Sequence, residues 1–466
     1  MKYISTRGKV NEIGFIDAVL MGLATDGGLL VPDKIPQITA DELQAMSQLS
    51  YQELAYEIIS YYVDGEISEI ELKELIEKSY GTFRHSEVTP VVKVKDNMYI
   101  LELFHGPTFA FKDVALQFLG NLYSYIAKKT GVTINILGAT SGDTGASAIE
   151  GVRGKEGIRI CILHPHGKVS KVQELQMTTV NDPTVLNLAI KGTFDDGQRI
   201  IKEIFADLEF KDKYHLRAIN SINFARILAQ TVYYFYAYFQ VSKNKKIKSI
   251  NFSVPTGNFG DIFAGYLAKR MGLPVGKLIV ATNENNILER FINEGVYKPG
   301  EFRSTYSPSM DIQVASNFER YLYYLLDENS DAVTTVMEQF KSEGKIVVSK
   351  EQLRQVQADF AAHGVHGEEC LDTIRKYHAK TNYLLDPHTS CGVAAYEQCN
   401  DASEVCVTLA TAHPAKFNEA IERCEIEQTY PEQIQQLFSK PQFLEVVEAD
   451  NAEIARRLEK HFTTAE

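Results

Sequence analysis

The sequence lacks several features that mark specialised classes of protein. No apolar run approaches the roughly 20 residues of a membrane-spanning helix, and the first residues have no apolar core of a secretory signal. The 6 cysteines are scattered without a Cys-x-x-Cys pair, which indicates neither a zinc site nor a disulfide framework. We therefore expect a soluble protein of a reducing cytoplasm, with no metal and no membrane partner.

The chain also has fewer basic than acidic residues. The chain has 48 lysines and arginines against 61 aspartates and glutamates, a formal net charge of −13. Nucleic acids and anionic membranes are bound by basic faces, so this balance argues against both partners. A charged fraction of 23% and a hydrophobic fraction of 44% are typical of a folded protein with ample core material. At 466 residues the chain is too long for a single core.

The periodicity of apolar residues changes near residue 90. Before it, apolar residues recur at helix spacing; after it, short β-branched runs alternate with helical stretches. This alternation indicates an α/β protein with open parallel sheets covered by helices on both faces. The predicted strands are residues 98–104, 133–137, 158–163, 185–190, 250–254, 278–281 and 405–409. We expect an N-terminal, mainly helical domain (1–90) and two three-layer α/β domains (91–240 and 241–466).

One lysine stands in apolar company where a predicted strand gives way to a helix. Residues 104–113 read Phe-His-Gly-Pro-Thr-Phe-Ala-Phe-Lys-Asp, which makes Lys112 the only cation of the stretch apart from a histidine. Desolvation lowers the pKa of a lysine, and only a neutral amine attacks a carbonyl to form a Schiff base. In the alternative interpretation, the stem of Lys112 lies on apolar surface and its ammonium reaches water. The local sequence leaves both open.

Three further turns follow predicted strands, where open parallel sheets bind ligands. Residues 138–145 read Gly-Ala-Thr-Ser-Gly-Asp-Thr-Gly, whose hydroxyls and amides suit an anion at a helix start. A helix cap is the alternative, but a cap needs one hydroxyl and this loop has three. Residues 254–261 form a second glycine-containing turn that resembles a phosphate cradle, and residues 385–392 form a third. None of these turns spells a Walker loop or the Gly-x-Gly-x-x-Gly dinucleotide motif.

In this order, the four turns resemble those of the second structural class of pyridoxal-phosphate enzymes, and within it the threonine synthase family. Similar strings occur along almost the whole chain, at residues 22–32, 192–196, 220–230, 309–312 and 316–320. The resemblance implies a lyase that turns O-phospho-L-homoserine and water into L-threonine and phosphate by γ-elimination and β-addition of water. It also implies the longer subfamily, with an added N-terminal domain. We expect a monomer or a homodimer, between which the sequence does not decide.

The resemblance also implies roles for individual residues. Lys112 would hold pyridoxal phosphate as a Schiff base and move protons, and Arg226 would bind the substrate phosphate. Thr389 would hydrogen-bond the pyridine nitrogen and temper the cofactor's electron withdrawal, since a hydroxyl does not favour a protonated ring. Many relatives have Asn where this chain has Asp143, which weakens the expectation of a charge contact there. The remaining expected cofactor contacts are Gly257, Asn258, Phe259 and Gly260, and the remaining substrate contacts are Thr140, Ser141, Thr144 and Ser221.

Two alternatives stay open. A related phospho-lyase or a threonine/serine dehydratase would release a 2-keto acid, but a dehydratase has no need of the phosphate contact expected at Arg226. A non-catalytic binder of a phosphorylated metabolite would have no need of Lys112.

Overall fold

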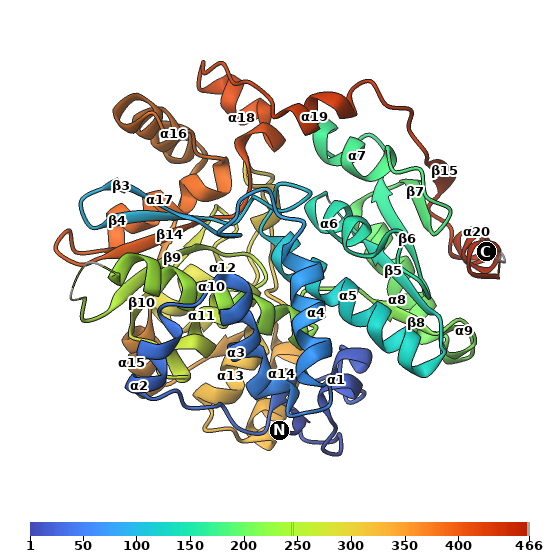
Figure 1. Ribbon diagram of the computed structural model, residues 1–466, viewed down its shortest axis with the longest axis horizontal. Coiled ribbons are helices and arrows are strands. Elements are labelled where there is room, and N and C mark those ends of the chain that lie inside the picture. The colour runs from blue at the N-terminus through green and yellow to red at the C-terminus, as the bar shows by residue number, and fades with distance from the viewer. Residues whose placement is uncertain (141, 244, 246, 464–466) are drawn as a thin grey trace.

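The computed structural model describes residues 1–140, 142–243, 245 and 247–463, in which two main sheets lie on either side of a long central helix (Figure 1). Ser141, one of the expected substrate contacts, lies outside the described residues. Within these ranges no helix has both the length and the apolar character needed to cross a membrane.

The N-terminal region is mainly helical and lies in the lower part of the molecule in Figure 1. Three of its helices begin with Ser or Thr followed by Glu at the third helical position, and each forms a capping box. A short antiparallel strand pair holds the first residues against residues 30–32. The elements are β1 (Tyr3–Ser5), α1 (Phe15–Met21), β2 (Leu30–Pro32), α2 (Ala40–Met46), α3 (Tyr51–Val63) and α4 (Glu69–Tyr80).

The larger sheet has six strands in the order β13-β10-β9-β14-β4-β3, all parallel except β3, which runs antiparallel to β4. Its strands are β3 (Val91–Lys95), β4 (Met98–Glu102), β9 (Ile250–Pro255), β10 (Val275–Thr282), β13 (Phe360–Gly364) and β14 (Cys406–Ala410). The elements beside it are α10 (Phe224–Ser242), α11 (Gly260–Arg270), α12 (Ile287–Glu294), β11 (Val296–Tyr297), η1 (Pro308–Met310), α13 (Phe318–Leu325), α14 (Ser330–Glu343), β12 (Ile346–Val347), α15 (Lys350–Asp359), α16 (Gly367–Thr381), α17 (Pro387–Cys399), η2 (Pro414–Lys416) and α18 (Asn418–Arg423).

The smaller sheet has five parallel strands in the order β15-β7-β6-β5-β8. Its strands are β5 (Ile134–Ala139), β6 (Ile158–Pro165), β7 (Val185–Lys191), β8 (Leu216–Ala218) and β15 (Glu445–Glu448). The helices beside it are α5 (Lys112–Thr130), α6 (Asp143–Val152), α7 (Lys171–Thr178), α8 (Phe194–Ala206), α9 (Leu208–Lys213), α19 (Glu432–Leu437) and α20 (Asn451–Thr463).

The central helix α5 joins the two halves and begins at the candidate Schiff-base lysine. It packs against α4, α6 and α10, and its middle is buried on all sides. The approach to α6 is so close that a methyl group at Gly120 would lie 1.9 Å from the carbonyl oxygen of Gly151. Two glycines facing one another therefore permit a backbone contact that fixes α5 against α6.

The α/β class and the parallel sheets are confirmed, and all seven predicted strands are present with small shifts at their ends. Apolar residues at helix spacing also predict a helix over residues 198–208. The observed helix α8 ends at Ala206, because the Asp207 carboxylate accepts the Phe210 N–H at 3.0 Å and starts a second helix, α9. Sheet membership also crosses the expected domain boundaries. Strands β3 and β4 belong to the larger sheet, whereas β15 from the C-terminal region extends the smaller one. The domain division itself stays a prediction.

Candidate active site

Lys112 is the first residue of α5, at the point where the loop from β4 enters the helix. Burial lowers the pKa of its amine to about 8, further lowered by Arg226 and Lys416 and partly offset by Asp143. The amine makes no hydrogen bond or ion pair with the described residues. Of the two interpretations of the sequence, the desolvated lysine fits this environment.

The loop before Lys112 is fixed by a buried aspartate. Asp113 accepts hydrogen bonds from the Thr108 N–H at 2.7 Å, the Thr108 hydroxyl at 2.6 Å and the Ser147 hydroxyl at 2.6 Å. Burial raises the pKa of Asp113, which those hydrogen bonds oppose. A methyl group at Gly106 would lie 2.4 Å from the Asp113 side chain. Asp113 thus ties the lysine loop to α6.

The glycine-rich turn after β5 contains one hydroxyl that caps helix α6 and one that is partly exposed. The Thr140 hydroxyl oxygen accepts the N–H groups of Gly142 at 3.0 Å and Gly145 at 2.9 Å, so it caps α6. The helix-cap interpretation therefore accounts for Thr140, whereas Thr144 is partly exposed.

Asp143 is buried at the start of α6 and carries a charge contact. Its Oδ1 accepts hydrogen bonds from Lys416 Nζ at 2.6 Å and Gln173 Nε2 at 2.8 Å, and the Ser309 hydroxyl donates to Oδ2 at 3.3 Å. Although burial alone would raise it, Lys416 and Lys112 hold the pKa of Asp143 well below its usual range. The Asp143 carboxylate is therefore matched by a buried ammonium.

The turn after β9 forms a backbone cradle. A methyl group at Gly257 would lie 2.9 Å from the Ser309 carbonyl oxygen and 3.3 Å from Met310 Cα. Phe259 has a φ of 64° and precedes α11, and no side chain among the described residues caps the first turn of this helix. The free N–H groups of this helix start face the turn, which suits a phosphate group.

The segment that begins α10 lies beside this cradle. Ser221 Oγ is 3.0 Å from Ser316 Oγ, and the Ser316 hydroxyl donates to Asn258 Oδ1 at 3.2 Å. Asn317 also bridges the two turns, through its N–H to the Asn258 carbonyl and its amide to the Ser221 carbonyl. The structure therefore brings two candidate anion sites together.

Arg226, in the first turn of α10, is 3% exposed, and two of its nitrogens, Nε and Nη1, have no hydrogen-bond partner among the described residues. Burial lowers the pKa of its guanidinium to about 10. A buried cation without an anion is costly, and a guanidinium fork matches a phosphate or carboxylate. Arg226 therefore needs an anionic ligand.

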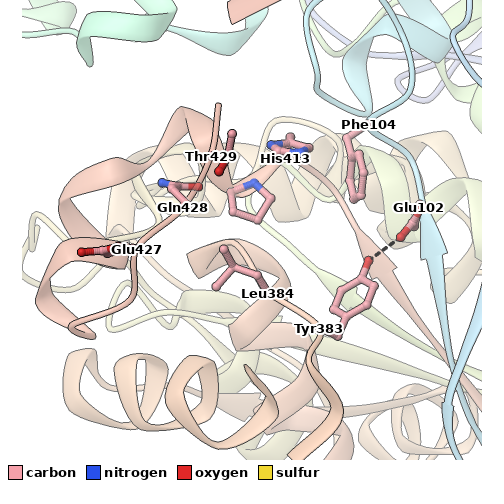
Figure 2. Close-up of a pocket in the computed structure, with 9 residues that line it drawn as sticks. Glu102, Phe104, Tyr383, Leu384, His413, Glu427, Gln428 and Thr429 are labelled. Atoms are coloured by element: carbon pink, nitrogen blue, oxygen red, sulfur yellow. Dashed lines mark hydrogen bonds between the residues drawn. The ribbon is translucent and has the colours of Figure 1, made fainter. Parts of the chain in front are cut away.

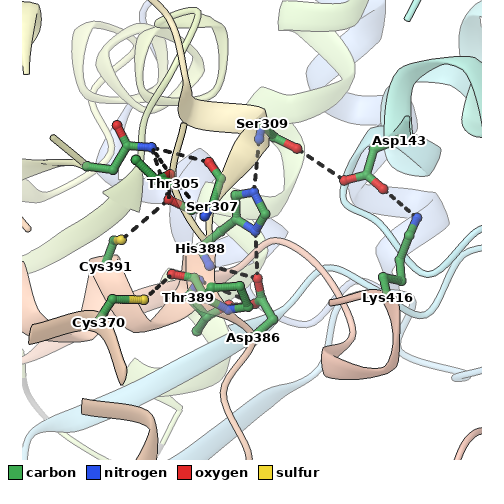
Figure 3. A network of polar contacts seen from close by, with 12 residues as sticks. Asp143, Thr305, Ser307, Ser309, Cys370, Asp386, His388, Thr389, Cys391 and Lys416 are labelled. Carbon is green, nitrogen blue, oxygen red and sulfur yellow. Dashed lines mark hydrogen bonds and ion pairs between the residues drawn. The ribbon is translucent and has the colours of Figure 1, made fainter. Parts of the chain in front are cut away.

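Thr389 lies at the start of α17, within a polar network that runs through the site (Figure 3). Its hydroxyl donates to Asp386, which also accepts the His388 N–H and Nδ1–H at 2.9 Å each. His388 Nε2 accepts the Ser309 N–H at 3.2 Å, so the imidazole proton resides on Nδ1. The network connects Thr389 through Ser309 to Asp143.

Sequence reasoning missed four members of this network: Asp386, Ser309, Gln173 and Lys416. Ser309 lies within a string that resembles the family, and Lys416 follows the central strand β14, where a ligand site is expected. These positions in the sequence could have indicated Ser309 and Lys416 as candidate site residues. Lys168, in the string at residues 165–170 whose role the sequence leaves open, is exposed and donates to the Gly192 carbonyl at 3.1 Å.

A separate surface pocket of about 370 Å³ lies outside this site. Figure 2 shows Glu102, Phe104, Tyr383 and His413 on its wall, with Tyr383 donating to Glu102 at 2.8 Å. None of the expected site residues lines it. In the part of the chain that the structure describes, no three His, Cys, Asp or Glu side chains are grouped for a metal ion.

The lysine in an apolar site, the backbone cradle and the parallel strands that position them define a class. Residues 83–343 match the family model "Pyridoxal-phosphate dependent enzyme", so this is a pyridoxal-phosphate-dependent enzyme. Residues 2–80 match "Threonine synthase N terminus" and residues 389–457 match "Threonine synthase, C-terminal". The chain belongs to the threonine synthase family, as the resemblance implied.

Individual relatives agree. The threonine synthase of Pseudomonas aeruginosa is 45% identical over 464 residues, covering 99% of this chain and 98% of the relative. That of Saccharomyces cerevisiae is 48% identical, covering 90% and 88%. The crystal structure of pyridoxal-phosphate-bound threonine synthase from Brucella melitensis superposes with a TM-score of 0.96 at 42% identity, over 100% of each chain.

Proposed function

We propose that this protein converts O-phospho-L-homoserine and water into L-threonine and inorganic phosphate. The observation that supports the substrate assignment is the buried guanidinium of Arg226. Two of its nitrogens have no partner among the described residues, and it lies close enough to Lys112 to lower the pKa of that lysine. A substrate that brings its own phosphate supplies the missing anion. A dehydratase acting on threonine or serine would leave that charge unmatched.

The residues present fit pyridoxal phosphate. Lys112 offers an amine of lowered pKa, and the turn of Gly257, Asn258, Phe259 and Gly260 offers backbone N–H groups in a space that a methyl group would fill. We assign the cofactor phosphate to this cradle. Thr389 would contact the nitrogen of the cofactor ring. Asp143 would contact the edge of that ring beside Lys112.

When bound, the cofactor supplies an electron sink for the carbanionic steps of the reaction. Lys112 Nζ takes and returns protons at the substrate's Cα and Cβ, a role for which a pKa near the working pH is suited. Ser221 and Arg226 hold the leaving phosphate, and Thr140, Ser141 and Thr144 orient the substrate carboxylate.

The test is phosphate release from O-phospho-L-homoserine by the purified protein, with L-threonine identified as the second product. Lys112→Ala should abolish turnover and the borohydride-sensitive visible absorbance of the cofactor. Lys376→Ala is the matched control, because Lys376 pairs with Glu397 on the surface and should leave both unchanged. Release of a 2-keto acid in place of threonine would favour the dehydratase, and no release at all would refute the proposal.

A further inference from the structure

Lys416 is a buried lysine close to Lys112, which is itself partly buried. The Lys416 side chain is fully buried, and its ammonium donates to Asp143 Oδ1 at 2.6 Å (Figure 3). It also donates to the Thr108 carbonyl at 2.7 Å. Asp143 begins α6, whereas Thr108 belongs to the loop that carries Lys112. One ammonium therefore joins the two segments that surround the reactive amine.

The backbone around Lys416 is fastened to the same loop. The Phe111 N–H donates to the Thr411 carbonyl at 2.8 Å, and the His413 N–H donates to the Phe109 carbonyl at 3.1 Å. Burial and the nearby cation Arg84 lower the pKa of His413 to about 4. The imidazole stays neutral at physiological pH, so its Nδ1 accepts the Ala415 N–H at 3.1 Å and caps the turn that ends in Lys416. The segment that ends in Lys416 is thus held against the loop that carries Lys112, which fixes the position of the Lys416 ammonium.

The hydrogen-bond partners of Asp143 indicate how Lys416 affects Lys112. Lys416 and Gln173 both bond Oδ1, whereas Lys112 is not in the ion pairs that the described residues form. A buried carboxylate deprived of Lys416 would have Lys112 as its next cation. An amine paired with a carboxylate keeps its proton and does not attack a carbonyl.

We propose that Lys416 is a positioning residue that acts on Lys112 through Asp143. It takes up the carboxylate charge that would otherwise pair with Lys112, and its own charge favours the neutral amine. The inference rests on the proposed role of Lys112. The charged groups that face Lys112 are Asp143 at the start of α6, Asp113 on α5, Arg226 on α10 and Lys416 at the end of η2.

The test compares Lys416→Met, Asp143→Asn and the double variant with the wild type. Each full-length protein is freed of cofactor and labelled with trace acetic anhydride across a range of pH. Mass spectrometry of the peptide containing Lys112 gives the fraction acetylated, and hence the midpoint at which the amine loses its proton. The visible absorbance recovered on adding pyridoxal phosphate back shows that each variant is folded.

The expected shifts have opposite signs. Lys416→Met should raise the midpoint by about one pH unit, slowing labelling about tenfold at neutral pH, because an attraction replaces a repulsion. Asp143→Asn should lower it, because the like charge of Lys416 is then unopposed. The double variant should return to within about half a unit of the wild type, since both charges are gone.

A structural role alone would shift the variants in one direction, or none, and either result would overturn the proposal. Lys376→Met is the control, because this lysine pairs with Glu397 on the surface and does not face Lys112. The measurement requires no turnover, so it is independent of the proposed substrate. Signed shifts without phosphate release would refute the proposed function only, and phosphate release with coincident midpoints would refute this inference only.

Discussion

The hydroxyl of Thr389 donates to the carboxylate of Asp386, three residues earlier in the chain. Asp386 caps α17 and also accepts the Nδ1–H of His388. The orientation of Thr389 is therefore set by a residue that would not itself contact the cofactor. Because Asp386 is 1% exposed, each of its hydrogen bonds is made away from water.

Removing that carboxylate should destabilise the protein. Asp386→Ala leaves a buried hydroxyl and an imidazole N–H unpaired and uncaps a helix, at a cost of about 2–4 kcal/mol. Asp386→Asn keeps an acceptor for the helix and should cost about half as much. The measurement is the shift in thermal midpoint of the holoenzyme. Asn329→Ala, which removes an exposed cap of α14, should cost about 1 kcal/mol, and an equal effect of Asp386→Ala would contradict the role of burial.

Arg226 should determine affinity for the phosphate-bearing substrate. Arg226→Ala should lower kcat/KM for O-phospho-L-homoserine by about 30- to 1,000-fold, the loss of a charge-assisted hydrogen bond worth about 2–4 kcal/mol. Arg226→Lys should recover little, because an ammonium does not reproduce the bidentate geometry. Binding of L-threonine, followed by the cofactor spectrum, should change little. An equal loss for both ligands would mean that Arg226 is structural.

Gly257→Ala should weaken binding of the cofactor. The added methyl group would lie 2.9 Å from a backbone oxygen that cannot move cheaply, so the cradle must deform. We expect the dissociation constant for pyridoxal phosphate to rise by about 10- to 100-fold, or about 1.4–2.8 kcal/mol. Gly300→Ala is the matched control, because its nearest neighbour is a side-chain atom at 3.4 Å. Unchanged affinity in Gly257→Ala would place the phosphate elsewhere.

Asp261 should make stability fall as the pH rises. It is buried near the start of α11, and burial raises its pKa to about 6, although Tyr233 and Tyr234 donate to its Oδ1 at 2.5 and 2.8 Å. The folded protein binds this proton more tightly than the unfolded chain. The stability it contributes is therefore full below about pH 4 and lost as the pH rises through about 6.

The measurement is the thermal midpoint of the wild type and Asp261→Asn between pH 5 and 8. The asparagine oxygen still accepts from both tyrosines but does not titrate, so the variant should gain on the wild type by about 1.4 kcal/mol across that range. The exposed Asp212→Asn should run parallel to the wild type. Parallel curves for Asp261→Asn would show that this carboxyl does not titrate with folding.

The sequence predicted the buried strands and missed the strands at sheet edges. Strands such as β5 and β9 are mainly apolar and are buried over most or all of their residues, as parallel sheets covered on both faces require. By contrast, β15 and β8 are short, and β15 is mostly exposed, so their apolar pattern is weak. Which sheet a strand joins depends on pairing between distant residues, and local patterns do not encode it.

The site divides in the same way. Lys112, Arg226 and the turn at Gly257 each lie within a continuous sequence motif, so the sequence alone indicates them. Lys416 and Asp386 matter through the partners they meet in space. The contact between Lys416 and Asp143 depends on β14 lying next to β4, which brings the segment after β14 against the lysine loop. No spacing of residues along the sequence predicts the contact between Lys416 and Asp143.

Strand β14 lies between β9 and β4, both of which precede it by well over 100 residues in the chain. During synthesis, those two strands therefore leave the ribosome without the partner that will separate them. The larger sheet closes only when residues 406–410 arrive, and β15 then completes the smaller sheet. Unpaired strand edges and exposed apolar faces persist until that late step, which makes nascent and truncated chains natural clients of chaperones and proteases.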